Sequence, residues 1–339
     1  MASNPVSSAD SVAERAKRKL VRDLGPLAMD ALGQPGCREL IRNADGTLWF
    51  EGLQTGMVRI GTMPHAQAEA VVKTVAGYHG KEATRATPIV EGELPFDGSR
   101  FAGQLPPIVA SPTFAIRKKA IAVYTLDEYV KSGTMTQVQR EAIGCAAKER
   151  DNILVVGGTG SGKTTLVNAV IQEMVVATPS DRICIIEDTG ELQCTAANYV
   201  QYHTTLDVTM TQLLRLILRM RPERILVGEV RGGEALDLLD SWSTGHPGGA
   251  ATLHANSAMA GLTRLNSLVT RNSAAPTDIN KLIGEAVNVL VYIARTPAGR
   301  RVEDVIALDG YRDGEYVVKK RLLHGGTRSP GPQSSLLYK

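Results

Sequence analysis

Residues 157–165, GGTGSGKTT, have the residue types and spacing of a phosphate-binding loop. Glycines let such a backbone curl so that its N–H groups face phosphate oxygens, and the N-terminus of the helix that follows adds partial positive charge. Lys163 can reach the β- and γ-phosphates, and the Thr164 hydroxyl suits Mg²⁺. ATP and Mg²⁺ are therefore the expected cofactors. The predicted binding residues are Gly157, Gly158, Thr159, Gly160, Ser161, Gly162, Lys163, Thr164 and Thr165.

Acidic side chains at two predicted strand ends are candidates for handling the metal and the attacking water. The run ILVGEVRGG (225–233) resembles the strand that carries a magnesium-site carboxylate in nucleotide hydrolases, but Gly228 stands where an aspartate is expected. Glu229 follows it and could polarise the water. Glu187 and Asp188 end a second apolar run, where the carboxyl ends of parallel strands converge on a ligand. We expect Glu187 or Asp188 to share this role with Glu229, and Glu191, on the next turn, is a further candidate.

Two histidines lie in the glycine-rich segment TGHPGGAATLHAN (244–256). His246 and His254 are eight residues apart, so they lack the i, i+4 spacing of a metal-binding pair on one helix. A loop that holds a histidine close to the γ-phosphate is the preferred interpretation, because an imidazole can donate a hydrogen bond to that phosphate. The alternative is a histidine satisfied within a turn.

Apolar runs and helical segments alternate through the second half of the chain. The apolar runs are NILVVGG (152–158), RICIIED (182–188) and RILVGEV (224–230). Between them, residues 162–176 and 213–222 have helical spacing, and Pro222 is expected to stop the second helix. This alternation predicts an α/β fold in which helices cover both faces of a parallel sheet. Strands around turns are expected for residues 288–308 and 314–323.

The first part of the chain has a different pattern. Two short strands around an Asn-Ala-Asp-Gly turn are predicted within 39–52, a helix for 65–80, and a small antiparallel sheet from Pro88 to Ile121. The expected organisation is an N-terminal α+β domain (1–133), a linker and lead-in helix (134–147), a nucleotide-binding domain (148–325) and a flexible tail (326–339).

Length and composition limit the class of protein. The chain has 339 residues, enough for two domains with their own cores. Its 43% hydrophobic and 22% charged residues are typical of a soluble globular protein, and a net charge of +3 argues against a dedicated nucleic-acid binder. The four cysteines form no C-x-x-C pair, which disfavours a zinc site. Neither a signal peptide nor a run of ~20 apolar residues is visible, so a cytoplasmic location is expected.

The order of four motifs resembles that of the secretion ATPases that serve type IV secretion, conjugation, type II secretion and type IV pili. The motifs are GGTGSGKTT, the acidic box IIEDTGEL, the strand ILVGEVRGGEA without its aspartate, and the histidine box TGHPGGAATLHAN. The chain is short and lacks a C-x-x-C zinc insertion. Residues 259–269 also lack the AIRNLIRE-like segment of retraction motors. The resemblance is therefore strongest to the conjugal-transfer, TrbB-type branch.

The resemblance implies a RecA-like ATPase domain with a parallel sheet, preceded by a smaller, PAS-like α+β domain. It also implies that Glu229, with Glu187 and Asp188, handles the water and the metal, and that the N-terminal domain supplies arginines to the triphosphate. Arg100 in GSRFAGQLPPI and Arg117 in FAIRKK match those arginine positions. The expected partners are other copies of the chain in a six-membered ring and the secretion or conjugation machinery of the inner membrane, where the protein is held peripherally.

Other functions remain open at this stage. The same core occurs in motors stimulated by single-stranded DNA and in ATPases of pilus assembly or retraction. A scaffold that binds nucleotide without hydrolysing it is disfavoured, because Lys163, Thr164 and Glu229 are all present. Direct nucleic-acid binding and the transported substrate cannot be decided from the sequence.

Overall fold

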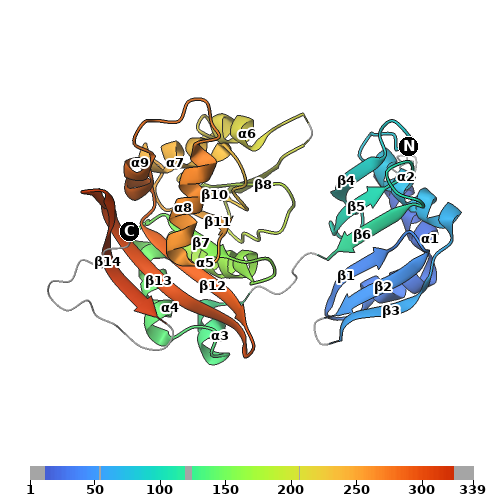
Figure 1. Cartoon of the computed structure of the whole chain (residues 1–339), viewed down its shortest axis with the longest axis horizontal. Coiled ribbons are helices and arrows are strands. Elements are labelled where there is room, and N and C mark those ends of the chain that lie inside the picture. The colour runs from blue at the N-terminus through green and yellow to red at the C-terminus, as the bar shows by residue number, and fades with distance from the viewer. Residues whose placement is uncertain (1–11, 53–54, 119–123, 206, 324–339) are drawn as a thin grey trace, which may run out of the picture. The chain divides into compact units, whose positions relative to one another are not determined.

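A computed structural model describes residues 12–52, 55–118, 124–205 and 207–323 (Figure 1). The chain divides into two compact units, Met1–Ile121 and Ala122–Lys339. The expected flexible tail, 326–339, lies outside the described residues. Within the described ranges, no helix is both long enough and apolar enough to cross a membrane.

The first unit is a six-stranded antiparallel sheet with two helices packed on one face. Its strands lie in the order β3-β2-β1-β6-β5-β4. The strands are β1 (Cys37–Arg42), β2 (Thr47–Gly52), β3 (Gly56–Thr62), β4 (Ile89–Glu93), β5 (Arg100–Gln104) and β6 (Thr113–Arg117). Helices α1 (Val12–Gly33) and α2 (His65–Tyr78) bury Leu40, Phe101 and Ile116 of the sheet. The strands and the helix predicted for this region are thus present.

The opposite face of this sheet carries a row of charged side chains. Arg100 lies opposite Arg117 on the neighbouring strand. Glu93 lies opposite Arg100, and Glu39 lies opposite Arg117. Directly opposed residues of antiparallel strands point to the same face, and these four alternate with the buried residues that face the helices. The two arginines are therefore adjacent on the face without helices, with a glutamate on either side.

The second unit is built on an eight-stranded sheet in the order β14-β13-β12-β7-β11-β10-β8-β9 (Figure 1). The six strands from β12 to β9 pair in parallel, and β13 and β14 extend the sheet in antiparallel pairs. The strands are β7 (Ile153–Gly157), β8 (Ile183–Glu187), β9 (Tyr199–His203), β10 (Arg224–Val227), β11 (Ala250–His254), β12 (Val289–Thr296), β13 (Gly299–Arg312) and β14 (Glu315–Leu323).

Helices cover both faces of this sheet, as predicted. Helices α3 (Leu126–Lys131), α4 (Gln137–Lys148) and α5 (Lys163–Ala177) cover one face; α6 (Met210–Ile217), α7 (Glu234–Ser243), α8 (Ala258–Val269) and α9 (Ile279–Ala286) cover the other. Residues of β7 alternate between these layers: Ile153 and Val155 face the first group, and Leu154 and Val156 face the second. Burial on both faces explains why the parallel strands are almost wholly apolar.

The end of helix α6 differs from the one predicted. Helix α6 ends at Ile217 and not at Pro222. A residue before proline is disfavoured in the α region, and Arg221 adopts a left-handed φ of 53°. The turn bond from Met220 N to Ile217 O already closes the helix end.

Helix α3, placed by sequence before the interdomain linker, lies in the second unit. Leu126 and Tyr129 are buried in that unit's core against α4 and α5. The division therefore falls at Ile121 and Ala122, twelve residues before the expected one.

Candidate active site

The phosphate loop connects the end of β7 to the start of α5. Gly160 and Gly162 have φ of 69° and 99°, a conformation that glycine adopts at no steric cost. An ideal Cβ on Gly157 would lie 2.3 Å from the Ile293 carbonyl oxygen and 2.6 Å from Ser161 Oγ, so only glycine fits there. Ser161 Oγ is buried and has no hydrogen-bond partner within the described part of the chain. The loop therefore has the tight backbone that its sequence predicts.

Lys163, the first residue of α5, is only 7% exposed. Its Nζ donates to the carbonyl oxygens of Gly157 at 3.1 Å and Gly158 at 3.0 Å. Nζ also lies 3.2 Å from Nδ1 of His254. The expected phosphate-binding lysine thus bonds to its own loop in this structure, and a bound phosphate would take over at least part of these contacts.

His254 links Lys163 to Glu229. Its Nε2 lies 2.7 Å from Glu229 Oε1, on the side opposite the Nδ1 contact with Lys163. Burial, followed by the positive charge of Lys163, lowers the pKa of His254, although Glu229 acts in the opposite direction. Because an ammonium group can only donate, Nδ1 of His254 accepts from Lys163. The 2.7 Å approach of Nε2 to Glu229 Oε1 is a close contact of basic and acidic groups, and this oxygen is buried without a hydrogen-bond partner within the described part of the chain. His254 ends β11, level with Gly157 at the end of β7.

His246 does not share this position. It precedes β11, whose first residues pair with the start of β7, and Gly249 O accepts a hydrogen bond from Ile153 N. His246 therefore lies before the amino ends of β7 and β11, whereas the phosphate loop follows the carboxyl end of β7. Of the two histidines predicted to sense the γ-phosphate, the structure brings only His254 to the loop.

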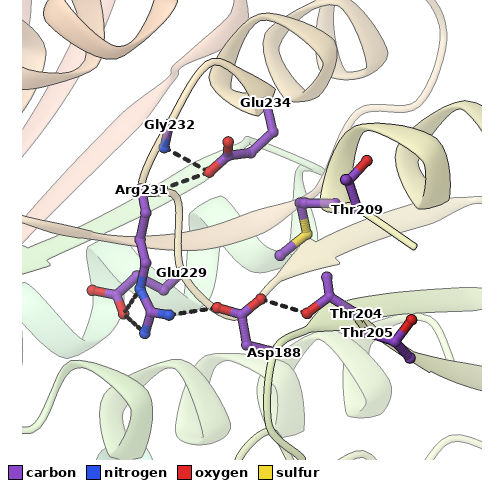
Figure 2. Close-up of a pocket in the computed structure, with 9 residues that line it drawn as sticks. Asp188, Thr204, Thr205, Thr209, Glu229, Arg231, Gly232 and Glu234 are labelled. Atoms are coloured by element: carbon purple, nitrogen blue, oxygen red, sulfur yellow. Dashed lines mark hydrogen bonds and ion pairs between the residues drawn. The ribbon is translucent and has the colours of Figure 1, made fainter. Parts of the chain in front are cut away.

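Asp188 and Glu229 meet at Arg231 (Figure 2). Arg231 Nε donates to Glu229 Oε2 at 2.8 Å, and Nη2 bonds to the same oxygen. Arg231 Nη1 lies 2.5 Å from Asp188 Oδ2, and the other Asp188 oxygen accepts from Thr204 Oγ1 at 2.7 Å. Both Asp188 oxygens are therefore engaged, one by Arg231 and the other by Thr204, and a metal contact of Asp188 stays a prediction.

These side chains line an open pocket of about 380 Å³ at the carboxyl ends of β8, β9 and β10 (Figure 2). Its other walls come from Thr205, Thr209, Met210 and Glu234. Sequence reasoning did not assign this pocket. The sequence contained one signal for it, the acids that follow β8 and β10. The contribution of β9 could not be predicted, because β9 was not recognised as a strand of the sheet.

Glu187 is 2% exposed and does not face solvent. Its Oε2 accepts hydrogen bonds from the backbone N–H groups of Glu191 at 2.8 Å and Leu192 at 3.0 Å. Gln201 Nε2 bonds to the other oxygen. Burial raises the pKa of this carboxyl to about 7 against the opposing effect of these bonds. Glu187 therefore holds the loop that follows β8 and is not exposed to a water molecule.

The position of Glu187 also explains the glycine at 228. An ideal Cβ on Gly228 would lie 2.7 Å from Glu187 Cβ, which is closer than real Cβ atoms approach. Gly228 N donates to Ile186 O at 2.8 Å, and Gly228 O accepts from Thr252 Oγ1 at 2.6 Å. The backbone is fixed from both neighbouring strands, so an aspartate side chain has no room at this position.

The residues around the loop fit a nucleotide with Mg²⁺. Thr164 is half-buried in the first turn of α5, directly after Lys163. Mg²⁺ is usually held by one or two protein ligands together with substrate phosphates and water, so Thr164 would hold the ion with the phosphates of a nucleotide. Among the described residues, no group of three or more His, Cys, Asp or Glu side chains could hold a metal ion.

Arg100 and Arg117 belong to the first unit, whereas the phosphate loop belongs to the second. Their adjacency on the open sheet face gives a pair of like charges that an anion could bridge. Contact between this pair and a bound triphosphate stays a prediction.

Comparisons with known proteins show which proteins the chain is similar to. Residues 81–297 match the family model described as type II/IV secretion system protein. The chain is 48% identical to the conjugal transfer protein TrbB of Rhizobium radiobacter over 302 residues, covering 89% of this chain and 93% of that protein. It is 32% identical to the type IV secretion system protein PtlH of Bordetella pertussis, covering 84% and 92% of the two chains.

A solved structure shares the fold. The ATPase DotB of Legionella pneumophila superposes with a TM-score of 0.62 at 17% identity, covering 89% of this chain and 83% of that one. This supports a RecA-like unit preceded by a smaller α+β unit, as expected. From its family match and its identity to TrbB and PtlH, the chain belongs to the type II/IV secretion system protein family.

Proposed function

We propose that this chain is an Mg²⁺-dependent ATPase that assembles into a six-membered ring and energises conjugal transfer through a type IV secretion machine. The proposal is carried by two consecutive side-chain contacts beside the phosphate loop, one between Lys163 and His254 and the other between His254 and Glu229. These contacts join an ammonium group, an imidazole and a carboxylate beside the loop, which supports a joint role for the three side chains at the phosphates. The names of the relatives TrbB and PtlH support the transfer and secretion context.

Each residue has a stated role in this proposal. The loop N–H groups and Lys163 bind the phosphates, and Mg²⁺ held with Thr164 would neutralise charge on them. Glu229 accepts a hydrogen bond from the attacking water and orients it. His254 turns from Lys163 toward the γ-phosphate when the lysine engages the nucleotide. Glu187 acts indirectly by fixing the loop after β8.

The proposed assembly explains how two residues of the first unit take part. Arg100 and Arg117 would contact the triphosphate when the units are arranged in the ring. In that arrangement the protein is cytoplasmic and is held at the inner membrane by the partner machinery.

The test compares wild type with Glu229→Gln and Lys163→Ala. Glu229→Gln should bind ATP with nearly unchanged affinity and lose ~10²-fold or more of its turnover, because only the water-orienting group is removed. Lys163→Ala should lose affinity as well. Binding is measured with a fluorescent nucleotide and turnover by phosphate release in Mg²⁺. Normal turnover by Glu229→Gln would remove Glu229 from its proposed role.

The ring is tested separately by measuring turnover per chain over a wide range of protein concentration. Turnover that rises and then saturates, in step with the appearance of hexamer in light scattering, supports a site completed by assembly. A monomer that hydrolyses ATP at the full rate would contradict the ring.

A further inference from the structure

Arg231 holds the carboxylate of Glu229 by one oxygen (Figure 2), and His254 approaches the other oxygen. The two oxygens of Glu229 are divided between two bases: Oε1 lies 2.7 Å from His254 Nε2, and Oε2 accepts from Arg231. Both Nε and Nη2 of Arg231 bond to that single oxygen. This division determines which oxygen of Glu229 lies next to His254.

The position of Arg231 is itself determined by its surroundings. The backbone N–H groups of Arg231 and Gly232 both donate to Glu234 Oε1 at 2.7 Å, at the start of α7. The far side of the guanidinium bonds to Asp188, which Thr204 holds in turn. The backbone of Arg231 is therefore held by Glu234, and its guanidinium group by Asp188 and Glu229.

The continuous chain of side chains runs along the carboxyl edge of the sheet from Lys163 to Thr204. It passes through His254, Glu229, Arg231 and Asp188, and crosses the ends of β11, β10 and β8. Glu229 is 16% exposed and Arg231 50% exposed. An isolated exposed ion pair contributes little, but a guanidinium shared by two carboxylates in a network constrains the orientation of both.

We propose that Arg231 is a positioning residue for ATP hydrolysis: it sets the orientation of the Glu229 carboxylate and leaves nucleotide binding unaffected. The inference rests on the proposed role of Glu229. It assigns Asp188 to the orientation of Arg231, which accounts for an acid whose two oxygens are bonded to Arg231 and Thr204.

The first experiment separates turnover from binding. In Arg231→Gln the guanidinium is lost, so kcat should fall roughly 10- to 100-fold, as expected when a reacting group is misplaced by about 1 Å. The dissociation constant for ATP should change by less than about threefold, because only the orientation of Glu229 is affected. Arg231→Lys should recover part of kcat. A loss of affinity equal to the loss of kcat would overturn the inference.

The matched control is Arg271→Gln. Arg271 is an exposed arginine whose Nη1 lies 3.4 Å from the Arg231 carbonyl oxygen. The Arg271→Gln substitution removes one positive charge next to the backbone of Arg231 and leaves the contacts of Glu229 in place. The kcat of this variant should therefore remain at the wild-type value. An equal loss in Arg271→Gln would show that general charge or segment stability is responsible.

The second experiment is a double-mutant cycle with Glu229→Gln, measured by single-turnover hydrolysis. If Arg231 acts through Glu229, Arg231→Gln causes no further loss in the Glu229→Gln background. Independent, multiplying losses would assign Arg231 a direct contact with nucleotide or partner and overturn the inference. If Glu229→Gln itself turns over normally, the proposed function fails. If Glu229→Gln is impaired but Arg231→Gln is not, only the role of Arg231 fails.

Chemical rescue gives an independent readout. Arg231→Gly should regain turnover when guanidinium chloride is added at millimolar concentration, because the free cation can occupy the site between Glu229 and Asp188. Sodium chloride at the same ionic strength should not restore turnover. A purely structural arginine would show no selective recovery, and that result would contradict the proposal.

Discussion

The side chain of Glu187 occupies the space in which a side chain on Gly228 would have to lie. An ideal Cβ on Gly228 comes within 2.7 Å of Glu187 Cβ and 3.6 Å of Glu187 Oε2. The glycine that follows β10 and the buried glutamate at the end of β8 are therefore linked, because the glutamate leaves no room for a side chain at position 228. The acid at the end of β8 is used to hold a loop, and the acid available to the site is Glu229, one residue further along.

We expect Gly228→Ala to lower the free energy of unfolding by about 1–3 kcal/mol, the usual effect of overpacking. The atom it meets is a Cβ near the backbone of Glu187, which cannot move away cheaply. Urea denaturation checks this. The control is Gly144→Ala in α4, whose new Cβ would come closest to the end of the flexible Arg140 side chain, with Glu173 Oε2 at an ordinary contact distance of 3.5 Å. Equal stability of the two variants would contradict the steric explanation.

Glu187 should make stability depend on pH in an unusual direction. Its folded pKa of about 7 exceeds the ~4.3 of an unfolded glutamate, so the folded state binds more protons between these values. The stabilising contribution of the protonated group is complete below about pH 4 and is lost as pH rises through about 7. Stability of wild type relative to Glu187→Gln should therefore fall by on the order of 1 kcal/mol per pH unit from pH 5 to 7. A constant difference would contradict the burial of the carboxyl.

Lys163→Met should raise the pKa of His254. The charge of Lys163, 3.2 Å from Nδ1, is the second cause that lowers this pKa after burial, and the substitution removes it. Histidine NMR titration of the nucleotide-free protein measures the change. An unchanged pKa of His254 would contradict the effect assigned to the lysine charge.

The buried pair Arg224 and Asp181 should be far more important for stability than an exposed pair. Arg224 is fully buried and also donates to the carbonyl oxygens of Gly248 and Ala147. Asp181→Ala leaves this charge without its carboxylate and should cost about 3–5 kcal/mol. Arg215→Ala, in which the arginine paired with Asp237 is 67% exposed, should cost less than about 1 kcal/mol. Thermal or urea denaturation distinguishes the two.

Arg100→Ala and Arg117→Ala should each lower kcat, in the proposed assembled enzyme, by roughly 10³-fold or more, the range for arginines that contact a triphosphate in the transition state. Arg59→Ala provides the control, because Arg59 is an exposed arginine on β3 of the same sheet, opposite Trp49 of β2. Phosphate release at a protein concentration that gives the assembled form is the measurement. Wild-type rates in both arginine variants would exclude them from the site.

The parallel sheet and the phosphate loop could be predicted because their signals are local. The apolar runs that became β7, β8 and β10 are buried on both faces, and the glycines of the loop are required by its own backbone. Long-range pairing has no comparable local signal. The edge strand β9, YVQYH, is exposed or half-buried along its length and was not recognised.

The contacts around Glu229 could not be predicted either, because they also join residues that are far apart in the sequence. The acids at the ends of β8 and β10 were identified, but the sequence could not show that Glu187 is directed into the core while Asp188 faces Arg231. The sequence also could not show that His246 and His254 lie at opposite ends of β11, because that separation depends on where the strand begins and ends. The resemblance to secretion ATPases supplied the family and the order of motifs, but not these contacts.

The adjacent Arg100 and Arg117 have a practical consequence for handling the protein. Like charges directly opposed across two strands destabilise a sheet, and they are screened or bridged by dissolved ions. Sulfate or phosphate, which can bind both guanidinium groups, should therefore stabilise the first unit more than chloride at the same ionic strength. The choice of buffer anion would then alter the storage life of the purified protein.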